Sequence, residues 1–101
     1  MDACMTLRIL TPEGAAAERG CDSVVFLLPD GADGRGGGFA GIMRNHAPAV
    51  MALAEGPLRA SLDGKPVLEA VVSGGFASVR DNVVTVLTES VIFSHNGAES
   101  G

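Results

Sequence analysis

The sequence predicts an all-β fold, an antiparallel sandwich or flattened barrel of short strands with no long helix. Three observations lead to this prediction. Short runs rich in β-branched residues recur about every 8 to 12 residues, and Gly, Pro, Asn and Asp separate them. No apolar stretch keeps a helical period for more than about two turns. The chain therefore has the strand spacing that is typical of two packed sheets.

The best hairpin signal lies between residues 71 and 88. Residues 76–80 alternate in character, residues 83–88 are β-branched, and Asp81-Asn82 stands between the two runs. Two turn residues between such runs are typical of a tight β-hairpin. Gly74-Gly75 comes just before, and glycine adopts positive φ without steric cost. We expect a sharp bend or bulge between Ser73 and Phe76.

Further strands are expected wherever apolar runs are bounded by turn residues. Pro12-Glu13-Gly14 ends the first strand, and Asp63-Gly64 predicts a second tight hairpin. The uninterrupted apolar run 24–28 suggests a strand buried on both faces. Residues 47–55 could form a helix, but nine residues with Pro48 near their start favour a strand. The remaining strands are expected at residues 6–11, 21–28, 39–43, 49–53, 58–62, 67–72 and 91–93.

Length, charge and composition limit the possible functions. A chain of 101 residues fits one domain, expected over residues 1–95 with a flexible tail at 96–101. Its net charge of −5 opposes binding to phosphate backbones, and 4% aromatic content offers no stacking platform for bases. We expect no nucleic-acid partner. Cys4 and Cys21 are expected to be free thiols in a reducing compartment. No signal peptide or run of about 18 apolar residues is apparent, so a soluble chain is expected.

Motifs for catalysis, cofactors and metals are weak. The glycine-rich segment 31–38 lacks the Gly-Lys-Ser/Thr ending of a phosphate loop and opens no predicted helix. Two histidines, His46 and His95, do not make a metal site. A site built from Ser73, His46 and Asp81 lacks the Gly-x-Ser-x-Gly pattern of a nucleophile elbow. We therefore expect no catalytic residue, no metal and no cofactor.

Several segments together resemble a known family. They are Thr6 to Pro12, Gly41 to Pro48 with its Asn45-His46-Ala47-Pro48, Gly56 to Arg59, Val72 to Phe76, and Asp81 to Leu87. In order and nearly in spacing they resemble the N-terminal β-sandwich domain of the epsilon subunit of F-type ATP synthase. The resemblance covers the chain from Thr6 to about Ser90 and implies a flattened sandwich of about ten strands.

The resemblance also implies a role and partners. Such a domain is a non-catalytic part of the central stalk, beside the gamma subunit and on the ring of c subunits. It helps to couple ring rotation to ATP synthesis or hydrolysis, at the cytoplasmic face of the bacterial inner membrane. Membrane association would come only through the complex. The ring-facing residues implied are Asp33, Arg35, Phe39, Arg44 and His46, and those implied for the gamma interface are Thr11, Pro12, Ser73 and Phe76.

Three departures from the family pattern matter. The chain ends where the family's C-terminal helical hairpin would begin, so hydrolysis restraint and ATP sensing are not assigned to it. Residues 29–38 are longer and richer in glycine than the short acidic turn of relatives. Our hypothesis is that this insertion modulates ring docking, and the alternative is a tolerated surface insertion. Arg44 stands where relatives commonly have proline.

A stand-alone β-sandwich interaction module is the main alternative to the stalk subunit. A small β-fold enzyme that uses His46 is a further one. A stalk interface should expose an apolar patch able to bury upwards of about 1,000 Å², so a uniformly polar surface would count against the stalk.

Overall fold

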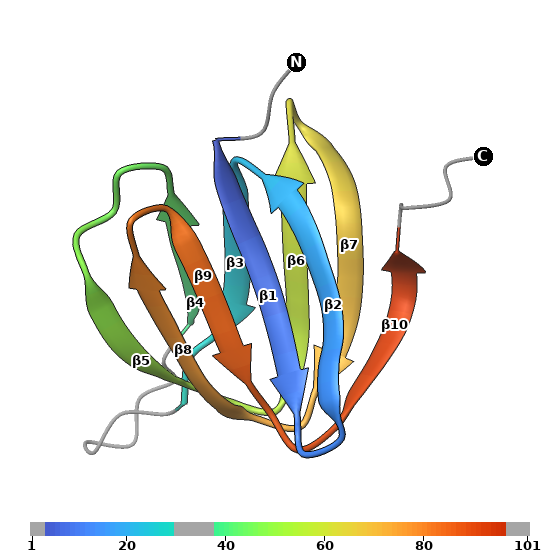
Figure 1. Cartoon of the computed structure of the whole chain (residues 1–101). Coiled ribbons are helices and arrows are strands. Elements are labelled where there is room, and N and C mark those ends of the chain that lie inside the picture. The colour runs from blue at the N-terminus through green and yellow to red at the C-terminus, as the bar shows by residue number, and fades with distance from the viewer. Residues whose placement is uncertain (1–3, 30–37, 97–101) are drawn as a thin grey trace.

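The computed structural model describes residues 4–29 and 38–96, and in this part of the chain every regular element is a strand (Figure 1). The all-β prediction is confirmed. The ten strands are β1 (Met5–Thr11), β2 (Gly14–Cys21), β3 (Ser23–Leu27), β4 (Phe39–Met43), β5 (Ala49–Leu53), β6 (Gly56–Leu62), β7 (Lys65–Val72), β8 (Gly75–Arg80), β9 (Val83–Leu87) and β10 (Val91–Asn96). No helix among these residues is long and apolar enough to cross a bilayer.

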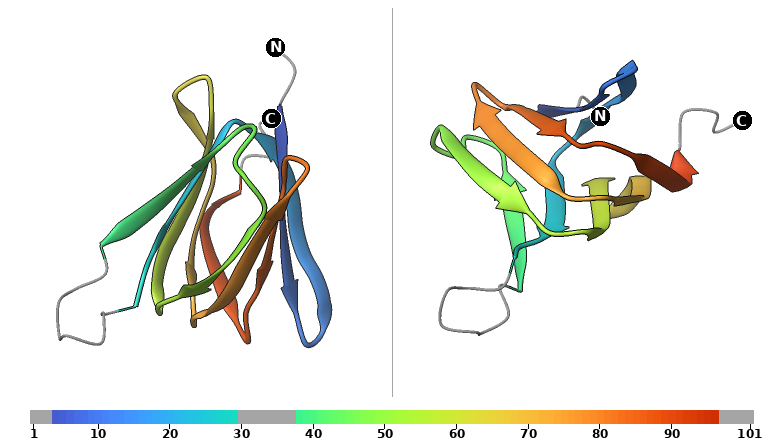
Figure 2. Two further views of the ribbon diagram at one scale, coloured as in Figure 1. Left: turned by 90° about the vertical axis from the view of Figure 1, so that its left-hand side faces the viewer. Right: turned by 90° about the horizontal axis from the view of Figure 1, so that it is seen from below.

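The strands form two five-stranded sheets that pack face to face (Figures 1 and 2). Sheet A has the order β2-β1-β9-β8-β5, and sheet B has the order β10-β7-β6-β3-β4. All pairings are antiparallel except one, because β1 runs parallel to β9, with Leu7 opposite Val84 and Ile9 opposite Val86. The expected antiparallel sandwich therefore contains one parallel pair, which joins the start of the chain to its last hairpin.

The core lies between the sheets and follows the two-residue period of the strands. Leu7 and Ile9 of β1, with Val84 and Val86 of β9, are fully buried from sheet A. These side chains pack against a layer of buried side chains from sheet B, which includes the fully buried Phe26. Burying one such side chain contributes about 1.5 to 3 kcal/mol relative to leaving it exposed. The alternation of buried and more exposed side chains on β1, β8 and β9 thus determines which face of sheet A is left for solvent or a partner.

Both tight hairpins expected from the sequence are present. Asp81 and Asn82 have φ of 52° and 65°, and Asp63 and Gly64 have φ of 55° and 80°. Positive φ at both central residues is the conformation that matches the twist of paired strands. These two turns define what we call the hairpin end of the sandwich. The β1–β2 turn and the bend at Gly74 lie at the opposite end, which we call the bend end (Figure 1).

Strand β2 was not expected from the sequence. It has three alanines followed by Glu18, Arg19 and Gly20, and no residue of the strand is β-branched or aromatic. It is a strand because it pairs with β1 along its length, from Thr11 opposite Gly14 to Met5 opposite Cys21. Tertiary pairing here overrides a weak local preference, as is common at sheet edges.

Other expectations need smaller corrections. The run 24–28 is not buried on both faces, because Val24 and Phe26 are buried while Val25 and Leu27 are only half-buried. Residues 49–53 form a strand, as favoured over a helix. The glycine-rich segment and the tail lie almost wholly outside the described residues, which end at Asn96.

Candidate docking surface

A row of apolar side chains crosses the outer face of sheet A near the bend end. The strand register places Phe76 opposite Leu87, and Leu87 opposite Leu10. Ala52 and Ala15 continue the row at the two edges. Phe76 and Leu87 are 58% and 52% exposed, although both are large apolar residues. We call this row the sheet A patch, made of Leu10, Ala15, Ala52, Phe76 and Leu87.

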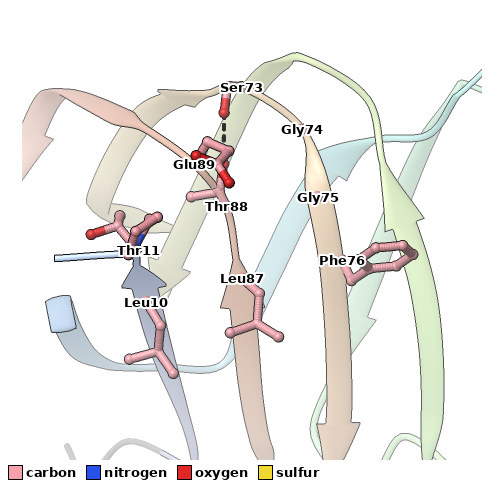
Figure 3. Close-up of a pocket in the computed structure, with 10 residues that line it drawn as sticks. Leu10, Thr11, Ser73, Gly74, Gly75, Phe76, Leu87, Thr88 and Glu89 are labelled. Carbon is pink, nitrogen blue, oxygen red and sulfur yellow. Dashed lines mark hydrogen bonds between the residues drawn. The ribbon is translucent and has the colours of Figure 1, made fainter. Parts of the chain in front are cut away.

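The patch continues into an open hollow at the bend end (Figure 3). Leu10, Phe76 and Leu87 supply its apolar wall. Thr11 and Pro12 come from the end of β1 and the turn after it. Ser73 and Gly74 come from the bend before β8, and Gly75 begins β8. All four residues implied for the gamma interface, Thr11, Pro12, Ser73 and Phe76, therefore line one hollow.

A small hydrogen-bond network holds the polar side of this hollow. The Ser73 hydroxyl lies 3.2 Å from the hydroxyl of Thr88 and accepts from the backbone N–H of Ser90 at 3.1 Å. Thr88 Oγ1 also donates to the carbonyl of Ser90 at 3.3 Å. Since Thr88 is buried, its hydroxyl needs these partners. The hydroxyls are thus engaged in tying the β7–β8 bend to the chain after β9.

Gly75 shapes the floor of the hollow. Its φ is 128°, and a Cβ placed there would lie 1.9 Å from the carbonyl oxygen of Leu87. Only glycine allows β8 to approach β9 this closely at the point where β8 begins. The bend expected between Ser73 and Phe76 is therefore confirmed, and its role is to bring Phe76 beside Leu87.

A second apolar row crosses the outer face of sheet B, also near the bend end. Ile92 lies opposite Val71, and Val71 lies opposite Pro57. Phe39, which is 62% exposed, shares a shallow hollow with Pro57, Val25 and Arg59. The Arg59 guanidinium is paired with Glu69 at 2.9 Å. The described residues therefore expose apolar surface on both sides of one end, and the surface is not uniformly polar.

The structure does not gather the residues implied to face the ring. Asp33 and Arg35 lie outside the described residues. Phe39 begins β4 at the bend end, whereas Arg44 and His46 follow β4 at the hairpin end. The His46 ring nitrogen Nδ1 lies 2.7 Å from the carbonyl oxygen of Ala47. A partner that covers the end of the sandwich at Phe39 would therefore leave Arg44 and His46 uncovered.

The candidate catalytic residues are also far apart. Ser73 precedes β8 at the bend end, while Asp81 follows β8 and His46 lies beyond β4, both at the hairpin end. The combination of Ser73, His46 and Asp81 is therefore not assembled. Within the described residues, no three His, Cys, Asp or Glu side chains are grouped to hold a metal ion.

The thiols lie where β1 and β2 meet at the hairpin end. Cys4 Sγ points to the carbonyl oxygen of Cys21 at 3.8 Å, and both cysteines are free, as expected. Burial, aided by the nearby charge of Asp22, raises the pKa of the Cys21 thiol to about 11. A thiol with such a pKa stays protonated at neutral pH and is a poor nucleophile.

The sheet A patch could be found only in part from the sequence. Phe76 was identified through the resemblance to the family, as the last residue of the bend expected at the double glycine. Leu10 and Leu87 were not, since they lie in separate strands and become neighbours only through the parallel β1–β9 pairing. The pairing register of two strands that are distant in sequence is set by the whole sheet, so no local sequence pattern predicts it.

The fold and this surface define a class of protein, the two-sheet β-sandwich with exposed apolar rows on its outer faces. In residues 4–29 and 38–96, the candidate catalytic side chains Ser73, His46 and Asp81 are dispersed, whereas the exposed apolar residues form rows across the sheets.

Comparisons with known proteins name the family. The family model described as "ATP synthase, Delta/Epsilon chain, beta-sandwich domain" matches residues 4–94. The ATP synthase epsilon chain of Desulfitobacterium hafniense (strain DSM 10664 / DCB-2) is 38% identical over 90 residues, covering 89% of this chain and 62% of the relative. That of Nitratidesulfovibrio vulgaris (strain DP4) is 41% identical over 90 residues, covering 89% of this chain and 61% of the relative. The chain belongs to the family of ATP synthase delta/epsilon β-sandwich domains.

Solved structures agree on the fold. A chain of the Euglena gracilis mitochondrial ATP synthase, in a structure of OSCP, F1 and c-ring, superposes with a TM-score of 0.71 at 24% identity. That match covers 92% of this chain and 55% of the other. A chain of the Tetrahymena thermophila ATP synthase central stalk and c-ring gives a TM-score of 0.63 at 15% identity, covering 90% and 67%. This chain spans about three-fifths of the length of the relatives above.

Proposed function

We propose that the chain is a non-catalytic central-stalk subunit of a bacterial F-type ATP synthase, at the cytoplasmic face of the inner membrane. In this role it links rotation of the c-subunit ring to the gamma subunit and so to ATP synthesis or hydrolysis. Membership of the family supports the proposal. The observation that carries it is the sheet A patch, a continuous apolar row on the outside of a sandwich whose potential catalytic residues are dispersed.

The sheet A patch and its hollow are the surface that we assign to gamma. Stable interfaces have an apolar core that is depleted of charge and enriched in aromatic residues, surrounded by a polar rim. Phe76 and Leu87 fit the core of such an interface, and Thr11, Ser73 and the exposed Glu89 fit its rim. The network around Thr88 fixes this rim before binding, so little conformational entropy is lost there on binding.

The sheet B side of the bend end, at Phe39, is the part that we assign to the ring. Phe39 is exposed there, and the insertion that contains Asp33 and Arg35 leads into the same strand. Arg44 and His46 lie at the other end, so in this arrangement they do not touch the ring. If they bind a partner, it is one that reaches the hairpin end.

A rigid sandwich suits a mechanical role. Its core is continuous from Met5 to Val86 across both sheets, and close-packed interiors deform little under load. The parallel β1–β9 pair places the N-terminal strand inside sheet A, between β2 and β9. Force applied at the bend end is therefore transmitted through the whole sheet rather than through a loop.

Binding to a purified gamma subunit tests the assignment of the sheet A patch. The chain is mixed with gamma of a bacterial ATP synthase, and complex formation is measured by size-exclusion chromatography and calorimetry. Phe76→Asp places a charge in the patch and should weaken binding at least about tenfold. Val71→Asp is the matched control, because Val71 is also exposed but lies on the outer face of sheet B. Equal loss of gamma affinity in Phe76→Asp and Val71→Asp, or no complex with the wild-type chain, would refute the assignment.

Shortening the insertion tests the contact with the ring. The insertion differs from the short acidic turn of relatives and is expected to modulate docking on the ring, so deleting residues 31–37 should change ring affinity. Binding to purified c-ring in detergent is compared for the deletion, for Phe39→Ala and for the wild-type chain. Unchanged affinity of the deletion variant would show that the insertion is only a tolerated surface segment.

A further inference from the structure

The four edge strands of the sandwich are not equally protected against pairing with another chain. An edge strand offers unpaired backbone N–H and C=O groups, and proteins usually block such edges with charges, prolines or bulges. The edges here are β2 and β5 in sheet A, and β10 and β4 in sheet B. They differ in whether they carry these blocking features.

Strands β2 and β10 are protected. In β2, Ile9 and Leu10 of β1 pair with Ala17 and Ala15, so Ala16 is an extra, bulged residue. The same strand carries Glu18 and Arg19. In β10, the register shifts between Phe93 and His95, which leaves Ser94 as the bulged residue. Bulges and charges both disfavour continuation of a sheet by another strand.

Strand β5 lacks these features. Its sequence, Ala49 to Leu53, has no charged residue, no proline and no register shift in its pairing with β8. In the described part of the chain, β8 is its only pairing partner. Val50 is 73% exposed, the largest value among the exposed large apolar residues of the described part. Strand β4 lies at the same side of the sandwich in sheet B and also has no charged residue (Figure 2). Residues 30–37, shortly before it, are not among those that the structure describes.

We propose that the free edge of β5 pairs antiparallel with β5 of a second copy of this chain. An antiparallel pair of identical strands is related by a two-fold axis, so one edge supplies both halves of the contact. The register follows from the faces of the strand. Val50 and Ala52 point outward while Leu53 is buried, so only registers that pair outward with outward residues are allowed.

The allowed register that pairs all five residues is centred on Met51. Val50 then lies opposite Ala52 of the second copy, Ala49 lies opposite Leu53, and Met51 faces its own equivalent. No charged residue falls within the paired segment. Because Ala52 belongs to the sheet A patch, the pairing brings Val50 of one copy beside the patch of the other. Two five-stranded sheets become one continuous sheet of ten strands.

The contact should be weak because the paired segment is short. Interfaces smaller than about 1,200 Å² are usually transient. We therefore expect a monomer–dimer equilibrium that depends on concentration, and we expect it for the free chain. The inference does not depend on the proposed stalk function, because it is argued from the free edge of β5 alone.

Sedimentation velocity over chain concentrations from about 10 to about 500 µM tests the proposal, because weak dimers dissociate within this range. The wild-type chain should shift toward twice its monomer mass as concentration rises. Val50→Lys should stay monomeric, since lysine is a natural blocking residue on edges. Ile92→Lys is the matched control, because Ile92 is 72% exposed on the edge strand of the other sheet. It should dimerise like the wild-type chain.

Hydrogen exchange gives a second readout that needs no variant. Amides of β5 should exchange more slowly at high chain concentration, while amides of β10 should not change. A wild-type chain that stays monomeric throughout, or equal loss of dimer in Val50→Lys and Ile92→Lys, would overturn the proposal. Protection of β5 that appears only on addition of gamma would also overturn it, because the edge would then take a strand of gamma.

Discussion

Gly75 illustrates how one residue sets the candidate interface. A Cβ at this position would lie 1.9 Å from the carbonyl oxygen of Leu87, and φ is 128°. We expect Gly75→Ala to lower the free energy of unfolding by at least about 2 kcal/mol, because β8 must move away from β9. Urea unfolding measures the change. Gly41→Ala is the control, since Gly41 has open space around it, and should change stability by less than about 1 kcal/mol.

The Cys21 thiol predicts how stability depends on alkaline pH. Burial raises its pKa from 9.0 to about 11, so the unfolded chain loses this proton before the folded chain does. The contribution of the protonated Cys21 thiol to the free energy of unfolding is fully present below about pH 9. It falls by up to about 2 kcal/mol as pH rises toward 11. Few other groups that titrate in this pH range obscure the effect of Cys21, because the chain has no tyrosine.

Urea unfolding between pH 8 and about pH 11 checks this prediction, with Cys21→Ala as the reference. The wild-type chain should lose stability over this range faster than the variant, although the variant starts from a lower value because it leaves a small cavity. Parallel pH profiles for the two proteins would show that Cys21 ionises equally in both states.

At the level of elements, Asn82 links two connections at the hairpin end. It has φ of 65° and its Oδ1 accepts a hydrogen bond from the backbone N–H of Asn45 at 2.6 Å. The β8–β9 hairpin thus holds the β4–β5 connection, which carries Arg44 and His46. Asn82→Gly removes only this hydrogen bond, whereas Asn82→Ala also adds the cost of positive φ.

We expect Asn82→Gly to cost about 0.5 to 1.5 kcal/mol and Asn82→Ala to cost about 1 to 2 kcal/mol more. Thermal unfolding of the three proteins checks this order. If alanine were tolerated as well as glycine, the positive φ would not be a constraint on this turn.

How well an element can be predicted from the sequence depends on where its stabilising partners lie. The hairpins at Asp63-Gly64 and Asp81-Asn82 are local, so their turn residues predict them directly. Strand β2 has no local preference for the extended state and forms because β1 is beside it. The insertion 29–38 was identified only by comparison with the family pattern, and its residues 30–37 lie outside the described residues.

At the scale of the whole molecule, the sequence predicts the class of fold but not its surfaces. Periodicity predicts which residues face inward, and the core residues of β1, β8 and β9 follow it. The sheet A patch depends on the order of strands in the sheet, above all on the parallel β1–β9 pair. Likewise, Phe39 is close in sequence to Arg44 and His46 but lies at the bend end, whereas those two lie at the hairpin end. Strand β4 runs from one end to the other.

The central claim is that this sandwich couples other subunits mechanically and performs no chemistry of its own. ATP-driven ion pumping tests it most directly, using bacterial ATP synthase in vesicles that has been depleted of its epsilon chain. Adding the wild-type chain should restore pumping, and adding Phe76→Asp should not, while Val71→Asp should restore it. Pumping that stays absent when the wild-type chain is bound to the depleted enzyme would contradict the account.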